Sequence, residues 1–245
     1  MWDFLGRTAL VVGQDALDRL RGARVALLGL GGVGGAAAEA LCRLGVGRLL
    51  LVDHDVVEES NLNRQILATR EVLGQSKTQA ARRRLASISP GLVIETAETF
   101  YLPEESDFLY DWRPDLVLDA TDTVSAKLHL ARECEARGIP LISAMGTGNR
   151  LDPSRLRLGD VWETAGNGCP LARIMRRELR RRGVEHLLTV YSQEPPLRGL
   201  CAGEANGRHS PGSTALVPPA AGYLMAYGAF RVLTGDTGGL LPGRD

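Results

Sequence analysis

The chain has 245 residues, enough for one sizeable α/β domain with a smaller appended region. Its 29 basic and 29 acidic residues cancel, so no overall field indicates a nucleic-acid partner, although a balanced total can conceal a local basic patch. The four cysteines are widely spaced and form no CxxC pair, which argues against a disulfide framework and against a zinc site built on paired cysteines.

The sequence also indicates a cytoplasmic protein with no membrane span. The N-terminus lacks the basic segment followed by an apolar one that marks a signal peptide. The most apolar late stretch, 214–233, contains Pro218, Pro219 and Arg231. Since these residues suit a spanning helix poorly, we expect a buried helix there.

Short apolar runs and helical segments alternate through the first 145 residues. The apolar runs predict strands at 24–28, 48–52, 92–96, 116–118 and 140–144. Helical spacing closed by glycine or proline predicts helices at 36–44, 75–88 and 124–137. Such alternation predicts a Rossmann-like α/β fold, with a mostly parallel sheet and helices on both faces.

The pattern changes after residue 145. We expect strands at 156–162 and 187–191, a basic helix at 171–182, and a mobile glycine-rich loop at 198–213. The predicted organisation is a single domain over residues 1–245. Its nucleotide-binding core covers 1–145, and 146–245 forms a smaller strand and helix extension for substrate and dimer contacts.

A glycine motif follows the first predicted strand. Residues 29–34 read GLGGVG and fit G-x-G-x-x-G, which places Gly29, Gly31, Gly32 and Gly34 between a strand and a helix. These glycines permit a tight turn and close backbone approach, and the helix N-terminus offers N–H groups to phosphate. Asp53 ends the second strand, where it can accept hydrogen bonds from a ribose. The motif predicts a bound nucleotide without specifying which one.

A polar segment then departs from what a dehydrogenase needs. Asn61, Asn63, Arg64 and Gln65 lie within five residues, and Lys77 begins the next helix. Arginine and lysine that converge on a phosphate chain would bind it and neutralise charge that develops on transfer. In isolation such a segment is more often a solvated loop, but its place after a phosphate-binding turn favours a triphosphate site.

Two carboxylates follow the predicted strand 116–118. Asp119 and Asp122 fall at the carboxyl end of that strand, which faces the ligand crevice of an open parallel sheet. They could hold Mg²⁺ against phosphate oxygens, with Asp122 the stronger candidate. The alternative for Asp122 is an N-cap of helix 124–137.

These pieces, in this order, resemble the ubiquitin-activating-type adenylating enzymes, in particular their bacterial ThiF, MoeB and HesA branch. The resemblance covers roughly residues 14–144. It implies that ATP binds on the glycine loop and that the active unit is a homodimer. It also implies a role for each of the candidate residues. Asp53 would hold the ribose with Asp55 nearby, Asn61, Asn63, Arg64, Gln65 and Lys77 would meet the phosphates, Asp122 would meet Mg²⁺, and Arg7 would enter the partner subunit's site.

The chain lacks the two CxxC pairs usual in branch members that activate a ubiquitin-like carrier, and it has Thr123 where they tend to have Asn. The later half instead resembles the tRNA threonylcarbamoyladenosine dehydratases, at SAMGTGNRLDP (143–153), CPLAR (169–173), MRRELR (175–180), Tyr191-Ser192 and Val217-Pro218. This implies that ATP adenylates the threonyl carboxylate of threonylcarbamoyladenosine at tRNA position 37, which closes to the cyclic form with release of AMP and pyrophosphate.

Several alternatives remain open at this point. The enzyme could adenylate the C-terminal glycine of a ubiquitin-like sulfur carrier, act as an NAD-dependent oxidoreductase, or serve as a nucleotide-sensing scaffold. A sulfur-relay protein could dock on it. Cys169 precedes a helix and is either structural or a thioester nucleophile. The basic helix 171–182 is either a solvated face or a contact for tRNA phosphates.

Overall fold

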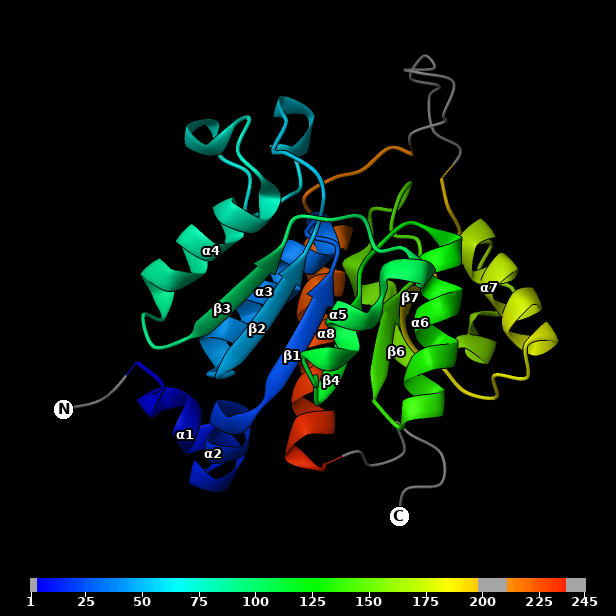
Figure 1. The fold of residues 1–245 in the computed structure, drawn as a ribbon. Helices are drawn as coiled ribbons and strands as arrows, with labels where there is room; N and C mark the ends of the chain where they lie inside the picture. Colours follow the sequence, from blue (N-terminus) through cyan, green and yellow to red (C-terminus); the bar gives the residue numbers. More distant parts are fainter. Residues whose placement is uncertain (1–3, 198–210, 237–245) are drawn as a thin grey trace.

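A seven-stranded sheet organises the part of the chain that the computed structural model describes, residues 4–197 and 211–236 (Figure 1). The strands are β1 (Arg24–Leu28), β2 (Arg48–Val52), β3 (Val93–Ala97), β4 (Leu116–Asp119), β5 (Leu141–Ala144), β6 (Leu156–Asp160) and β7 (Leu188–Ser192). Their order is β3-β2-β1-β4-β5-β7-β6, and only β6 and β7 pair antiparallel. The predicted Rossmann-like, mostly parallel α/β fold is confirmed.

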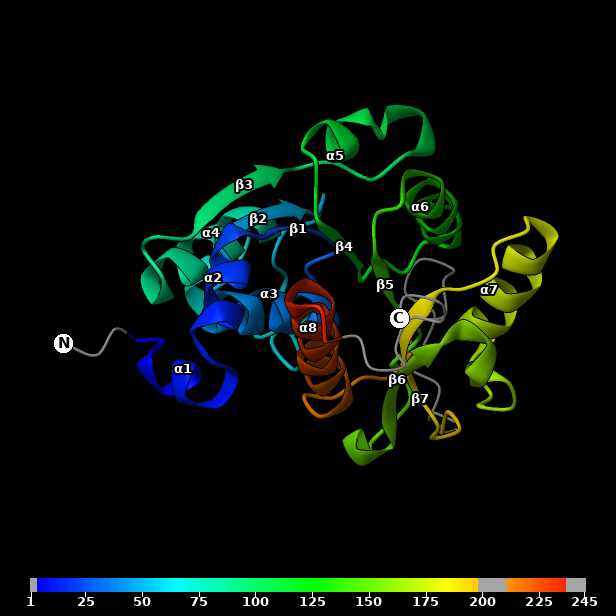
Figure 2. The same ribbon diagram turned by 90° about the horizontal axis from the view of Figure 1, so that it is seen from below.

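Helices cover both faces of this sheet (Figure 1, Figure 2). One face packs against α2 (Gln14–Gly22), α3 (Gly32–Leu44), α4 (Lys77–Ile88) and α8 (Val217–Thr234). The other packs against α5 (Asp107–Asp111), α6 (Val124–Arg137) and α7 (Pro170–Arg181). The remaining α-helix of the described residues, α1 (Gly6–Val12), lies beside α2 near the amino end of β1. Strand side chains that alternate between the two faces therefore build two apolar cores.

The element boundaries follow from local chemistry. Helix α4 begins at Lys77 because the Ser76 hydroxyl caps it, accepting from Gln79 N at 3.3 Å. Helices α3 and α6 end at Gly45 and Gly138, both in the left-handed conformation that glycine adopts without strain. These ends match the sequence prediction closely.

Other boundaries differ from the prediction. Helix α3 begins at Gly32, four residues early, because the glycine turn leads directly into it. The predicted strand 156–162 stops at Asp160, whose carboxylate caps a 3₁₀ turn, Val161–Thr164. The sequence reading did not include α1, α2 or α5. The predicted mobile loop falls largely on residues 198–210, outside the described residues.

The expected division at residue 145 does not interrupt the sheet. Strand β7 pairs with β5 of the core, and β6 completes that edge. The late apolar stretch returns as α8, which packs against α3 of the core. We therefore propose that the described residues form one structural domain. None of their helices is long and apolar enough to cross a bilayer.

The contact between α8 and α3 depends on Gly222. A Cβ at this position would stand 2.2 Å from the carbonyl oxygen of Val33 and 2.8 Å from the Cβ of Ala36. Such overpacking forces backbone shifts, so Gly222→Ala should lower the free energy of unfolding by about 1–3 kcal/mol, measured by urea denaturation. The matched control is Gly22→Ala near the end of α2, where a Cβ meets nothing within 4 Å.

Because alanine is the better helix former, the control should leave stability unchanged or raise it by up to about 1 kcal/mol. Equal destabilisation by the two substitutions would contradict the assigned α3–α8 contact.

Candidate nucleotide-binding site

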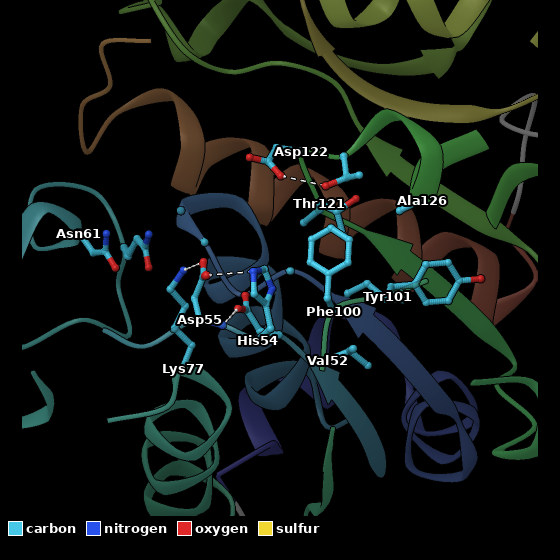
Figure 3. A pocket seen from close by; sticks show the side chains of 18 of the residues that line it. Val52, His54, Asp55, Asn61, Lys77, Phe100, Tyr101, Thr121, Asp122 and Ala126 are labelled. Atoms are coloured by element: carbon cyan, nitrogen blue, oxygen red, sulfur yellow. Dashed lines mark hydrogen bonds and ion pairs between the residues drawn. The ribbon is translucent and has the colours of Figure 1, made fainter. Parts of the chain in front are cut away.

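A pocket of about 390 Å³ opens at the carboxyl ends of β1, β2 and β4. Strand order reverses between β1 and β4, the place where open α/β sheets bind ligands. Its volume suits a small-molecule ligand. Of the predicted site residues, those that line it are Gly29, Gly31, Gly32, Asp53, Asp55, Asn61, Arg64, Gln65, Lys77 and Asp122. Figure 3 shows Lys77 and Asp55 side by side, with Asp122 on the loop that follows β4.

The glycine loop forms one wall of the pocket. Gly29 has φ +87°, and a Cβ there would lie 2.7 Å from the carbonyl oxygen of Ala120 after β4. A Cβ on Gly34 would lie 1.8 Å from the carbonyl oxygen of Gly29, so this glycine serves helix–strand packing and does not line the pocket. No side chain caps the N-terminus of α3. Its first backbone N–H groups are thus suited to an anion.

Asp53 ties the glycine loop to the second strand. One carboxylate oxygen accepts from Leu30 N at 2.6 Å and the other from Asp55 N at 2.8 Å. The side chain is largely buried yet still lines the pocket. Asp53 therefore shapes the turn, and its remaining lone pairs can accept from a ligand hydroxyl.

The two candidate cations differ in how their charge is balanced. Lys77 is buried, with Nζ 2.6 Å from Oδ2 of the half-exposed Asp55. Arg64 donates instead to neutral acceptors, the carbonyl oxygen of Ser60 and the amide oxygen of Asn63, both at 2.9 Å. Among the described residues it has no carboxylate partner. The pocket thus contains one uncompensated guanidinium, which would attract an anionic ligand.

The two aspartates after β4 face different surroundings. Asp122 is exposed and lines the pocket. Asp119 is fully buried and does not line it, which corrects the expectation that it would bind the nucleotide or a metal. Its carboxylate is occupied by Lys127, Ser143 and Thr121. The capping alternative for Asp122 is also wrong, since α6 starts after Thr123 with no side-chain cap.

Two further predicted residues lie outside the pocket. The side-chain amide of Asn63 donates to the carbonyl oxygen of Ser213 at 3.0 Å and joins the 60s loop to the segment before α8. Arg7 is exposed on α1 and does not line the pocket; Figure 1 shows this helix near the amino ends of the strands. Neither side chain lines the pocket of its own chain.

Residues after β3 complete the pocket, and the sequence reading missed them. Thr99, Phe100 and Tyr101 line it, and Figure 3 shows both aromatic rings there. Phe100 packs edge-on against His54, with ring centroids 4.8 Å apart. Burial raises the pKa of Tyr101 to about 12, and its hydroxyl contacts His129 Nδ1 at 2.9 Å. These residues could have been predicted from the position of β3, since residues that follow a parallel strand lie at the carboxyl edge of the sheet.

Cys169 has a structural environment. It is buried, caps α7, and its Sγ accepts from Ala172 N at 3.4 Å. No histidine contacts it through any interaction found in the described residues. The arginines at 173, 177, 180 and 181 of α7 and Arg182 just after it are exposed, while Met175 and Leu179 face the core. The basic helix therefore presents its charge outward.

Known proteins resemble this chain in sequence and in structure. The ThiF family model matches residues 5–242. The tRNA threonylcarbamoyladenosine dehydratase of Bacillus subtilis (strain 168) is 39% identical over 230 residues, which cover 89% of this chain and 90% of that protein. The molybdopterin-synthase adenylyltransferase of Escherichia coli (strain K12) is 40% identical over 129 residues, 53% of this chain and 51% of that protein.

Solved structures of the E. coli tRNA N6-threonylcarbamoyladenosine dehydratase, TcdA, are also similar. Its complexes with AMP and with ATP both superpose with a TM-score of 0.85 at 29% identity, and the match covers 95% of this chain and 94% of that one. The family model, the Bacillus relative and these structures each span nearly the whole chain. The chain therefore belongs to the ThiF family.

Proposed function

We propose that this chain is an ATP-dependent tRNA threonylcarbamoyladenosine dehydratase. It adenylates the threonyl carboxylate of threonylcarbamoyladenosine at tRNA position 37 and closes it to the cyclic form. The observation that carries the proposal is the pocket, in which an uncompensated Arg64 and the exposed Asp122 lie beside a glycine loop with an uncapped helix N-terminus. Similarity to the Bacillus dehydratase over 90% of its length supports this substrate.

The chemistry needs two displacements. A carboxylate oxygen attacks the α-phosphorus of ATP, the bond to the β-phosphate breaks, and pyrophosphate leaves. A nitrogen or oxygen of the carbamoyl group on the same side chain then attacks the acyl carbon, and AMP departs. The net change in the nucleoside is loss of one water. Because the nucleophile is intramolecular, the second step needs positioning more than activation, and no enzyme thiol is required.

The pocket residues divide this work. The backbone N–H groups at the start of α3 would hold phosphate, and Asp53 would accept from the ribose. Arg64 and Lys77 would neutralise charge on the phosphates, with Lys77 passing from Asp55 to the ligand. Asn61 and Gln65 would add donors from the same wall.

Asp122 would hold Mg²⁺. The donor set fits, since Asp122 is an exposed carboxylate on the pocket wall and Mg²⁺ prefers few protein carboxylates together with phosphates and water. When bound, the metal supplies charge stabilisation to the phosphate oxygens. Asp119 does not line the pocket, so we assign it no contact with the metal.

Adenylation of a sulfur-carrier protein is less well supported. The molybdopterin-synthase adenylyltransferase matches only 53% of this chain, and no CxxC pair is present in the sequence. We propose no sulfur-relay partner, because no described feature singles one out. Because the proposed substrate is a tRNA, we propose that the protein is cytoplasmic.

Removal of either central side chain tests the assignment. Arg64→Ala and Asp122→Ala should each lower the rate of AMP formation about 100-fold or more, because each removes charge stabilisation of the transferring phosphate. The assay is AMP release from ATP–Mg²⁺ and threonylcarbamoylated tRNA. Arg70→Ala is the matched control, since this exposed arginine pairs with Glu59 at 3.4 Å outside the pocket. Normal turnover by the folded Arg64 and Asp122 variants would refute the proposed roles.

The active unit is proposed to be a homodimer in which Arg7 enters the partner's pocket. Helix α1 buries none of its residues, and Leu10 and Val11 are 74% and 85% exposed. Such apolar exposure next to an arginine suits a surface covered by a second copy. Arg7 does not line its own pocket, and its helix α1 lies near the amino ends of the strands whereas the pocket lies at their carboxyl ends, which also favours action in trans.

Mixed dimers test this arrangement. Arg7→Ala and Asp122→Ala should each be inactive alone. Co-expressed with separate tags, they form heterodimers in which one of the two sites carries both wild-type residues. Random pairing should then restore about a quarter of wild-type AMP formation. No recovery in purified heterodimers would place Arg7 outside the partner's site.

A further inference from the structure

Lys127 is a fully buried cation that the site described above does not use. It lies in the first turn of α6 with none of its surface exposed. Its Nζ donates to Asp119 Oδ2 at 2.9 Å, to Ser143 Oγ at 3.2 Å and to the carbonyl oxygen of Ala144 at 2.8 Å. An ammonium group has three donors, so each is satisfied. The cost of burying the charge is offset by a complete set of partners.

Asp119 extends this network to the nucleotide pocket. Its Oδ2 also accepts from Ser143 Oγ at 2.6 Å. Its Oδ1 accepts from the backbone N and the hydroxyl of Thr121, at 3.1 and 2.7 Å. Thr121 lines the pocket and precedes Asp122. Asp119 therefore holds the turn that presents Asp122.

The same ammonium group also binds the end of β5, where a second loop begins. Ala144 ends β5, and the next residues, 145–149, leave the carboxyl edge beside the loop after β4. On the pocket side, the carbonyl oxygen of Ala120 lies where a Cβ of Gly29 would clash, so the β4 loop also contacts the glycine loop. Lys127 thus joins two adjacent loops, one of which abuts the glycine loop.

The fold alone does not require a charge at this position. Apolar side chains such as Leu128, Leu130 and Met145 pack around this face of the sheet, and a methionine has similar length to lysine. Replacing a buried ion pair by apolar groups of similar volume is often neutral or stabilising. A buried pair that bridges two loops at the pocket edge points to a role in loop geometry.

We propose that Lys127 is a positioning residue for the adenylation reaction. Its ammonium group, acting through Asp119 and Thr121, holds Asp122 at a fixed place relative to the glycine loop and to the loop after β5. This inference rests on the proposed function, because Asp122 is taken to hold Mg²⁺ against the phosphates of ATP.

The test compares Lys127→Met with the double variant Asp119→Asn/Lys127→Met. The single variant leaves Asp119 buried without its cation and should melt at a lower temperature. The double variant removes both charges and should regain most of the melting temperature. Its turnover number for AMP formation should stay about tenfold or more below wild type, because small misplacements of catalytic groups are costly. Its Mg²⁺ concentration for half-maximal rate should rise, with KM for tRNA little changed.

Cys134→Ala is the matched stability control. Cys134 lies buried on the same helix and takes part in none of the hydrogen bonds of Lys127 and Asp119. It should lower the melting temperature and leave turnover unchanged. A double variant with both the stability and the turnover of the wild type would overturn the inference, as would full turnover and an unchanged Mg²⁺ dependence in Lys127→Met.

Thr121→Val approaches the network from its other end and applies if the Lys127 variants do not fold. It removes the hydroxyl bond to Asp119 but leaves both charges in place. We expect reduced turnover and a higher Mg²⁺ requirement at an unchanged melting temperature, and unchanged kinetics would contradict the inference.

Calorimetry of ATP binding with and without Mg²⁺ gives a readout that does not depend on tRNA. Loss of the Mg²⁺-dependent gain in affinity in the double variant supports the positioning role, and retention of the full gain overturns it. If the wild-type protein forms no AMP with the tRNA substrate, the proposed function fails separately, and the calorimetric comparison still decides the role of Lys127.

Discussion

The site depends on the close approach of two backbones at the point where the strand order reverses. The loop after β1 passes so near the loop after β4 that a Cβ on Gly29 would meet the carbonyl oxygen of Ala120 at 2.7 Å. A Cβ on Gly34 would collide with Gly29 itself. Because only glycine allows these contacts, the start of α3 is held against the end of β4. The uncapped N–H groups of that helix and the carboxylate of Asp122 consequently face one pocket.

Charge in this pocket is distributed unevenly, and the distribution suits phosphate chemistry. The carboxylate of Asp55 neutralises the buried ammonium group of Lys77, and we propose that a phosphate of ATP replaces this carboxylate. Within the part of the chain that the structure describes, the hydrogen bonds of the Arg64 guanidinium go to neutral oxygen atoms, so its charge remains available to attract an anion. Asp119 and Lys127 neutralise each other beneath the pocket and leave Asp122 as the exposed carboxylate of the β4 loop.

Much of the fold, and ten of the 22 residues that line the pocket, could be predicted from sequence because they depend on local patterns. The glycine spacing and the apolar run before Asp53 place a phosphate-binding turn and a strand end without knowledge of the partner strands. Asp119 could not be assigned in this way. Its partner Lys127 looks like an ordinary residue of an amphipathic helix, and only packing reveals that both side chains are fully buried.

The aromatic wall and the N-terminal helices were missed for a similar reason. Phe100 and Tyr101 line the pocket because β3 pairs with β2. This pairing joins residues far apart in the sequence, so a local sequence pattern does not predict it. Helices α1 and α2 are short, and α1 has no buried face to produce an apolar period. That Arg7 does not line its own pocket likewise depends on how α1 and α2 pack near the amino ends of the strands.

The most direct test is mass spectrometry of nucleosides from threonylcarbamoylated tRNA after incubation with the protein and ATP–Mg²⁺, with AMP quantified in the same reaction. The proposed function predicts that the modified nucleoside loses one water and that AMP forms in an amount matching this loss. An unchanged nucleoside, with or without AMP formation, would contradict the tRNA assignment and direct attention to carrier-protein carboxylates as the group that is adenylated.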